Sequence, residues 1–178
     1  LGVAVTCEKC AETLPQFSIS IIFANSEMGA TGSFISLFTR SAYSSAILGL
    51  ASQISDAREG PSFLEHVNSS TTVAGHHIRI ENFVSNAVGA IVGEAVQTGD
   101  LVSINLANVT RLVVGEALLL ALPLLQWQAG AIIGTASYSP RGQEISLVEV
   151  DALVNGSDVT MSIINAHSSA TIGGIAAR

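Results

Sequence analysis

The sequence predicts an all-β protein, a jelly-roll or Greek-key β-sandwich with about one helix. The first indication is the alternation of apolar with small or polar residues, typical of half-buried strands, as at Val102, Ile104 and Leu106. The second is composition: 48% of the residues are hydrophobic and only 12% charged, which favours a packed core under a neutral polar surface. Together they indicate nine or ten short strands, with no repeat of fixed period.

The chain divides into an N-terminal strand or arm at residues 1–12 and a single β-sandwich domain at residues 13–178. Leu1, Val3 and Val5 share one face of the first strand. Such a segment is either an ordinary first strand or a donor strand that completes the sheet of a neighbouring subunit.

Alternation or apolar content predicts the remaining strands at 17–24, 33–39, 75–84, 87–96, 101–109, 144–154, 159–163 and 171–177. The helix is expected at 41–55, where Ala42, Ala46, Leu50 and Ile54 lie four residues apart. Turn residues at 97–100 and at 155–158, the latter an Asn-Gly pair, each predict a hairpin between neighbouring strands.

The apolar stretch 100–138 contains an uncharged window at 117–136 that is long enough to cross a membrane. Pro123 and the polar run 126–128 would lie inside that window, where unpaired polar groups are costly, so strands are preferred. The Gly-xxx-Gly spacings 89/93 and 130/134 are interpreted as small residues on one strand face rather than helix-packing motifs.

Charge and motifs exclude several functions. The net charge is −7 and Lys9 is the single lysine, so no basic patch for nucleic acid is expected. No nucleophile elbow, phosphate loop or dinucleotide motif is present, which argues against an enzyme and a cofactor. The low charge, the non-Met start and the glycosylation candidates Asn68, Asn108 and Asn155 favour an extracellular or cell-surface protein.

Two small clusters are candidate binding groups. Cys7 and Cys10 are the only cysteines, and we expect disulfide chemistry within or between subunits rather than a zinc site. His76 and His77, together with Glu81, are candidate metal ligands. They are weak candidates, because adjacent side chains on a strand point to opposite faces and cannot both reach one metal ion without a bulge.

The segment 103–109 (SINLANV), followed by Gly115-Glu116 and an alternating apolar strand, resembles a strand segment of the camelysin/TasA-like fibre proteins over about thirty residues. This chain would need a short insertion and lacks the proline before Gly115. The resemblance implies a secreted jelly-roll subunit that polymerises by donor-strand exchange, with residues 1–6 as the donor.

The leading hypothesis is therefore a secreted structural subunit that polymerises with itself into an extracellular fibre or pilus. A viral jelly-roll coat protein and a metal-dependent or ligand-binding β-sandwich are the alternatives.

Overall fold

The computed structural model describes residues 2–7, 20–41, 44–54, 61–84, 88–99, 101–125, 129–165 and 170–177. Within these ranges the chain forms ten strands and no helix, which confirms the all-β prediction. The strands are β1 (Gly2–Cys7), β2 (Ser20–Ala24), β3 (Glu27–Ser41), β4 (Ser45–Ile54), β5 (Ser62–Val84), β6 (Gly89–Gln97), β7 (Val102–Leu125), β8 (Gly130–Tyr138), β9 (Gln143–Asn165) and β10 (Ala170–Ala177).

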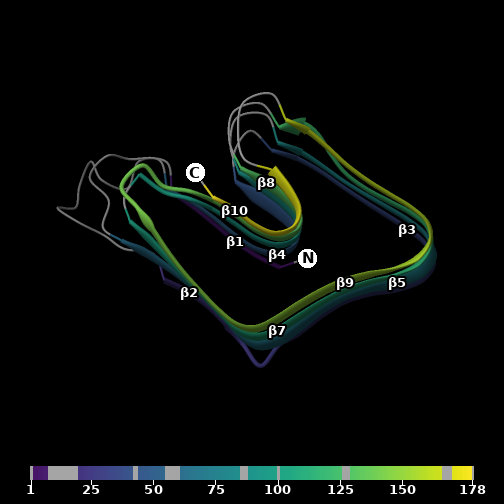
Figure 1. The fold of residues 1–178 in the computed structure, drawn as a ribbon, viewed down its shortest axis with the longest axis horizontal. Helices are drawn as coiled ribbons and strands as arrows, with labels where there is room; N and C mark the ends of the chain where they lie inside the picture. The colour runs from purple at the N-terminus through teal and green to yellow at the C-terminus, as the bar shows by residue number, and fades with distance from the viewer. Residues whose placement is uncertain are drawn as a thin grey trace.

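The strands alternate between two sheets as the chain advances. Sheet A contains strands in the order β1-β4-β6-β8-β10, and sheet B contains strands in the order β2-β5-β7-β9, with β3 also paired to β5. β4, β6 and β8 each form one layer with the long strand that follows, β1 forms a layer with β2 and β3, and β10 adds a fifth strand to sheet A. Figure 1 shows that successive layers nearly superpose. The curved short strands lie inside the angle of the long ones. This arrangement is a parallel β-solenoid.

Jelly-roll or Greek-key topology is not confirmed. All the pairs between described strands are parallel, whereas those topologies are built from antiparallel strands. The two predicted hairpins are wrong. Residues 97–100 join β6 to β7, which belong to different sheets. Residues 155–158 lie inside β9, and the residues on both sides of them pair with β7.

The helix predicted at 41–55 is also wrong, because Ser45–Ile54 forms strand β4. Ile47, Leu48, Leu50 and Ala51 are all buried, so the strand is covered on both faces. A strand buried on both faces shows no strict alternation, and its apolar residues can coincide with a helical spacing.

The chain does contain a structural repeat, which was not expected from the sequence, although its period is not fixed. Paired residues in neighbouring layers lie 40 to 47 residues apart, as Ser62 with Val102 and Gly2 with Gly49. The clearest markers are two columns of glycines: Gly2, Gly49, Gly93, Gly134 and Gly174 in sheet A, and Gly32, Gly75, Gly115 and Gly156 in sheet B.

Two apolar clusters fill the space between the sheets. One packs Leu48, Val92 and Ile133 of sheet A against long-strand residues such as Ile78 and Leu120. The other packs short-strand residues Leu50 and Val96 against Leu64, Ile104 and Leu106. The alternation predicted for 102–106 is therefore confirmed, since Val102, Ile104 and Leu106 are buried. Among the described segments, none is a helix with the length and hydrophobicity needed to span a membrane.

Candidate functional site

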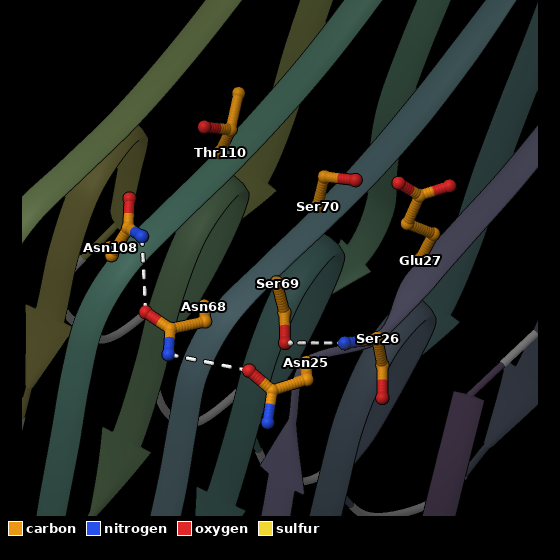
Figure 2. Close-up of a pocket in the computed structure, with 8 residues that line it drawn as sticks. All are labelled: Asn25, Ser26, Glu27, Asn68, Ser69, Ser70, Asn108 and Thr110. Carbon is orange, nitrogen blue, oxygen red and sulfur yellow. Dashed lines mark hydrogen bonds between the residues drawn. The ribbon is translucent and has the colours of Figure 1, made fainter.

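A polar groove follows a ladder of asparagines on the outer surface of sheet B. Asn25, Asn68 and Asn108 occupy the same position in three successive layers, and their side chains point along the stack (Figure 2). Nδ2 of Asn68 donates to Oδ1 of Asn25 at 3.3 Å, and Nδ2 of Asn108 donates to Oδ1 of Asn68 at 3.0 Å. The ladder therefore joins three layers by side-chain hydrogen bonds.

Backbone geometry explains why asparagine occupies this position. The three residues have φ angles of 52°, 49° and 53°, in the left-handed region that asparagine tolerates better than most residues. The long strand bends there. In the fourth layer the equivalent position, between Val148 and Val150, is held by Glu149, which has the same conformation (φ 52°) but lacks the amide.

Hydroxyl groups and one carboxylate complete the groove, which has a volume of about 420 Å³. Its other lining residues are Ser26, Glu27, Ser69, Ser70 and Thr110 (Figure 2). The Ser69 hydroxyl accepts a hydrogen bond from the Ser26 amide at 3.3 Å and donates to the Val67 carbonyl at 2.7 Å. The Ser26–Ser69 bond thus joins two layers, whereas the Ser69–Val67 bond lies within one strand.

A second polar cluster lies inside the solenoid, where sequence reasoning had found no site. Glu94 on β6 is fully buried, and its Oε1 lies 2.8 Å from Nδ1 of His66 on β5. Its Oε2 accepts a hydrogen bond from the Thr135 hydroxyl on β8 at 2.8 Å and forms an ion pair with the guanidinium of Arg111 on β7. One carboxylate therefore bonds to side chains from three successive layers.

The surroundings of Glu94 keep it ionised. Burial alone would raise the pKa of Glu94, but the charge of Arg111 and the hydrogen bonds from His66 and Thr135 outweigh it, and the pKa lies below its ordinary value. His66, Arg111 and Thr135 are each at most 3% exposed. We interpret the cluster as a structural connection, because the four side chains are buried and bond to one another across layers.

Beside this cluster, a cavity of about 290 Å³ opens at the C-terminal end of the solenoid. Arg111 and Thr135 contribute its polar groups, and Leu106, Leu147, Val150, Ala152, Gly174 and Ile175 form the rest of its lining. The Nε atom of Arg111 is buried and has no hydrogen-bond partner. A buried donor of this kind is uncommon, since most such groups are paired.

The end layers differ from the middle of the solenoid in their exposure. On β9 and β10, Leu147 and Ile175 are 45% and 38% exposed, whereas Leu106 and Thr135, their partners in the layer beneath, are at most 1% exposed. Among the described strands, none pairs with the outer edges of β9 and β10 or with those of β1, β2 and β3.

Several predicted site residues belong to strands of this solenoid. Val3 and Val5 lie on β1, which pairs with β4 of its own chain, while Leu1 and Cys10 lie outside the described residues. Cys7 is the last residue of β1. Because Cys10 lies outside the described residues, the predicted disulfide stays a prediction. Asn68 and Asn108 use their glycan-acceptor amides as donors in the ladder, and Asn155 is exposed on β9.

The residues of the metal hypothesis each have a different neighbour. His76 Nδ1 lies 3.5 Å from the Glu116 carboxylate, the His77 ring stacks on Phe34, and Glu81 accepts a hydrogen bond from Arg79 at 2.8 Å. No group of three or more His, Cys, Asp or Glu side chains that could hold a metal ion occurs in the described part of the chain.

Comparisons with known proteins identified no relative of this chain. A scan against protein-family models, a search of curated proteins and a search of solved structures each found no match to the chain, so its function has to be inferred from the solenoid itself.

Proposed function

We propose that the protein is a structural subunit that polymerises into an extracellular fibre through the end layers of its solenoid. The carrying observation is the exposure of apolar side chains and strand edges at the C-terminal end, exemplified by Leu147 and Ile175. Repeat proteins need polar end caps to stay soluble, and open strand edges template the addition of further strands. End layers of this kind favour assembly.

Composition supports an extracellular setting for such a fibre. Only 12% of the residues are charged, which fits a surface covered largely by neutral polar side chains. The glycosylation candidates Asn68, Asn108 and Asn155 fit an exported chain, and in the proposed fibre Cys7 and Cys10 are candidates for disulfide bonds within or between subunits.

A fibre is a better fit than the closed shell of a coat protein. Contact between two different ends of a molecule is heterologous, and such contacts extend without limit unless the rotation between copies closes a ring. Successive layers nearly superpose in Figure 1, so they are related with little rotation. Open growth is the expected result.

Negative-stain electron microscopy of the purified chain, combined with light scattering over a concentration series, tests the proposal. We expect unbranched fibres and a mass that rises with concentration. Monodisperse monomers at every concentration would overturn the proposal, and closed shells would favour the coat-protein alternative.

Donor-strand exchange is one route to the fibre, and edge stacking without exchange is the other. In the exchange route, β1 leaves β4 and completes a neighbouring copy. A variant lacking residues 1–10 separates the routes, because fibres that persist after the deletion exclude exchange of this strand.

A further inference from the structure

The two sheets of the solenoid end in different layers. Sheet A runs from β1 to β10, whereas sheet B begins with β2 and β3 in one layer and ends with β9. β10 therefore extends one layer beyond β9, and no described strand of sheet B lies beside it. The C-terminal end is a step, and the cavity of about 290 Å³ opens in this step between Leu147 and Ala152 of β9 and Gly174 and Ile175 of β10.

This step limits how a second copy can dock. The first layer of each copy contains β1 in sheet A and β2 and β3 in sheet B. If β2 and β3 of a second copy paired with β9, its β1 would enter the place that β10 already occupies. Docking on β9 is therefore possible only if one of these two strands leaves.

β10 fits the place that β1 occupies beside β4. Along the columns of sheet A, residues 174–176 (Gly-Ile-Ala) stand in the same columns as residues 2–4 (Gly-Val-Ala). β10 has eight residues and its columns reach residues 45–52 of β4, whereas β1 has six residues, paired with residues 49–54. The longer strand keeps more backbone hydrogen bonds, so β1 is the strand that we expect to leave.

The gain from docking lies in sheet B. In sheet A, β10 replaces the pairing that β1 gives up, but in sheet B the edge of β9 receives β2 and β3 as a new partner. The residues that would meet are apolar and belong to columns whose middle members are buried. These pairs are Ile21 with Ile145, Phe23 with Leu147, Ala30 with Val154, Ile35 with Val159 and Leu37 with Met161.

We propose that copies join by strand replacement: β10 of one copy takes the place of β1 beside β4 of the next, whose β2 and β3 pair with β9 of the first. β10 keeps its own pairing with β8, and β1 of the second copy is released. The inference rests on the proposed function, because it specifies the contact through which the fibre would grow. Both sheets then continue through the contact with four layers for each copy, a repeat of about 19 Å at a layer spacing of about 4.8 Å.

A disulfide that holds β1 on β4 tests the release. Val5 and Ser52 are partners in the parallel register, and a strand spacing of about 4.8 Å suits a disulfide. In a background with serine at Cys7 and Cys10, we expect oxidised Val5→Cys/Ser52→Cys to raise the critical concentration for fibre formation about tenfold or more, and dithiothreitol to reverse this.

A matched pair controls for the disulfide itself. Ser70→Cys/Thr110→Cys joins β5 to β7, which stay paired in the proposed contact, so its critical concentration should change less than about twofold on oxidation. Deletion of residues 1–10 should leave fibre formation intact, since it removes the strand that competes with β10.

Gly174→Ala tests the incoming strand. In a single copy, a Cβ atom at Gly174 has no atom within 4 Å. In the proposed contact it would face the carbonyl oxygen of Gly49 in the next copy, at about the 2.0 Å that separates a Cβ atom at Gly134 from the Gly174 carbonyl oxygen. We expect a critical concentration raised about tenfold or more.

Two further alanine variants complete this test. Gly32→Ala adds a Cβ atom 3.8 Å from its nearest neighbour in a single copy, but in the contact this atom would face the carbonyl oxygen of Gly156, so it should act like Gly174→Ala. Gly173→Ala is the control, because Ile133, Val92 and Leu48 already carry side chains in its column, and it should change the critical concentration less than about twofold.

The outcomes separate the contact from the fibre. Absence of fibres from the unmodified chain would overturn the proposed function itself. If that chain forms fibres, and Gly32→Ala, Gly174→Ala and the oxidised Val5→Cys/Ser52→Cys variant form them as readily, the replacement of β1 by β10 is wrong and the fibre grows through another contact.

Discussion

Gly93 offers the sharpest test of the layered architecture. It lies in the middle of the sheet A glycine column, between Gly49 and Gly134, with a φ angle of +134°. A Cβ atom at Gly93 would lie 2.0 Å from the carbonyl oxygen of Gly134 and 2.8 Å from its carbonyl carbon. Because real Cβ atoms approach other atoms no closer than about 3.0 Å, Gly93→Ala would force β6 and β8 apart by about 1 Å.

Two contributions set the size of the effect. A non-glycine residue in this region of φ costs about 1–3 kcal/mol. Separating the strands would also weaken the neighbouring backbone hydrogen bonds, at about 0.5–1.5 kcal/mol for each one lost. We therefore expect Gly93→Ala to lower the free energy of unfolding by about 3–5 kcal/mol, a large part of the 5–15 kcal/mol typical of a domain.

Urea unfolding followed by far-UV circular dichroism measures this loss, with Gly173→Ala as the matched control. A Cβ atom at Gly173 would lie 3.8 Å from its nearest neighbour, the Ile133 carbonyl oxygen, so this variant should change stability by less than about 0.5 kcal/mol. Equal unfolding midpoints for the two variants would refute the close approach of neighbouring layers.

Three further predictions concern polar contacts. Because the pKa of Glu94 is lowered in the folded protein, its ionised carboxylate stabilises the fold at any pH above the ordinary glutamate pKa, and this stabilisation is lost as the pH falls through the lowered pKa. We therefore expect the unfolding midpoint to stay constant from about pH 8 to about pH 5 and to fall steeply below about pH 4. Glu94→Gln should cost about 3–5 kcal/mol at pH 7, since it leaves the charge of Arg111 buried and unpaired, and its thermal midpoint should depend less on acid; an unchanged acid profile would contradict this role. Asn108→Gly should lower the free energy of unfolding by about 1 kcal/mol, because it removes the ladder hydrogen bond. Asn108→Ala should lower it by about 1 kcal/mol more, because alanine is strained at the positive φ angle, and equal unfolding midpoints of the two variants would argue against this strain.

Parts of the sheet B strands could be predicted from sequence because alternate residues are buried there, but residues 62–74 of β5 were not among the predicted strands. In β7, Leu118, Leu120 and Leu122 are at most 1% exposed, as their shared parity predicts. In sheet A, residues 87–96 and 171–177 are predicted as strands from their apolar content, which matches β6 and β10. β6 and β8 are buried at every position except the last, so no period of two marks them, and the helix predicted over β4 is wrong.

The topology was missed because a parallel pairing is not local. The Gly-xxx-Gly pairs 89/93 and 130/134 were interpreted correctly as residues of strands, and the structure places Gly89 beside Gly130 and Gly93 beside Gly134. They are the same pair in successive layers. Comparing VGAIVGEAV with AGAIIGTAS would have revealed the repeat of about 40 residues, although the intervening turns differ in sequence and weaken it.

The buried cluster has a weaker signature in the sequence. Glu94 stands out as the single acidic residue in β6, but His66 and Arg111 lie in other strands with nothing nearby to mark them. Only the stacking of layers brings the three side chains together. A repeat found early would have placed β5, β6 and β7 in neighbouring positions, although it would not have paired these side chains.

Glu94 and the glycine columns determine the register between layers, which burial of the apolar core alone does not determine. Sliding one layer by two residues keeps every apolar side chain on its own face, so hydrophobic burial penalises such a slip only weakly. The same slip would bring a residue with a Cβ atom opposite Gly134 and would separate Glu94 from Thr135, leaving a buried carboxylate short of a donor. Close glycine contacts and one buried charge therefore select a single register between the layers of the chain.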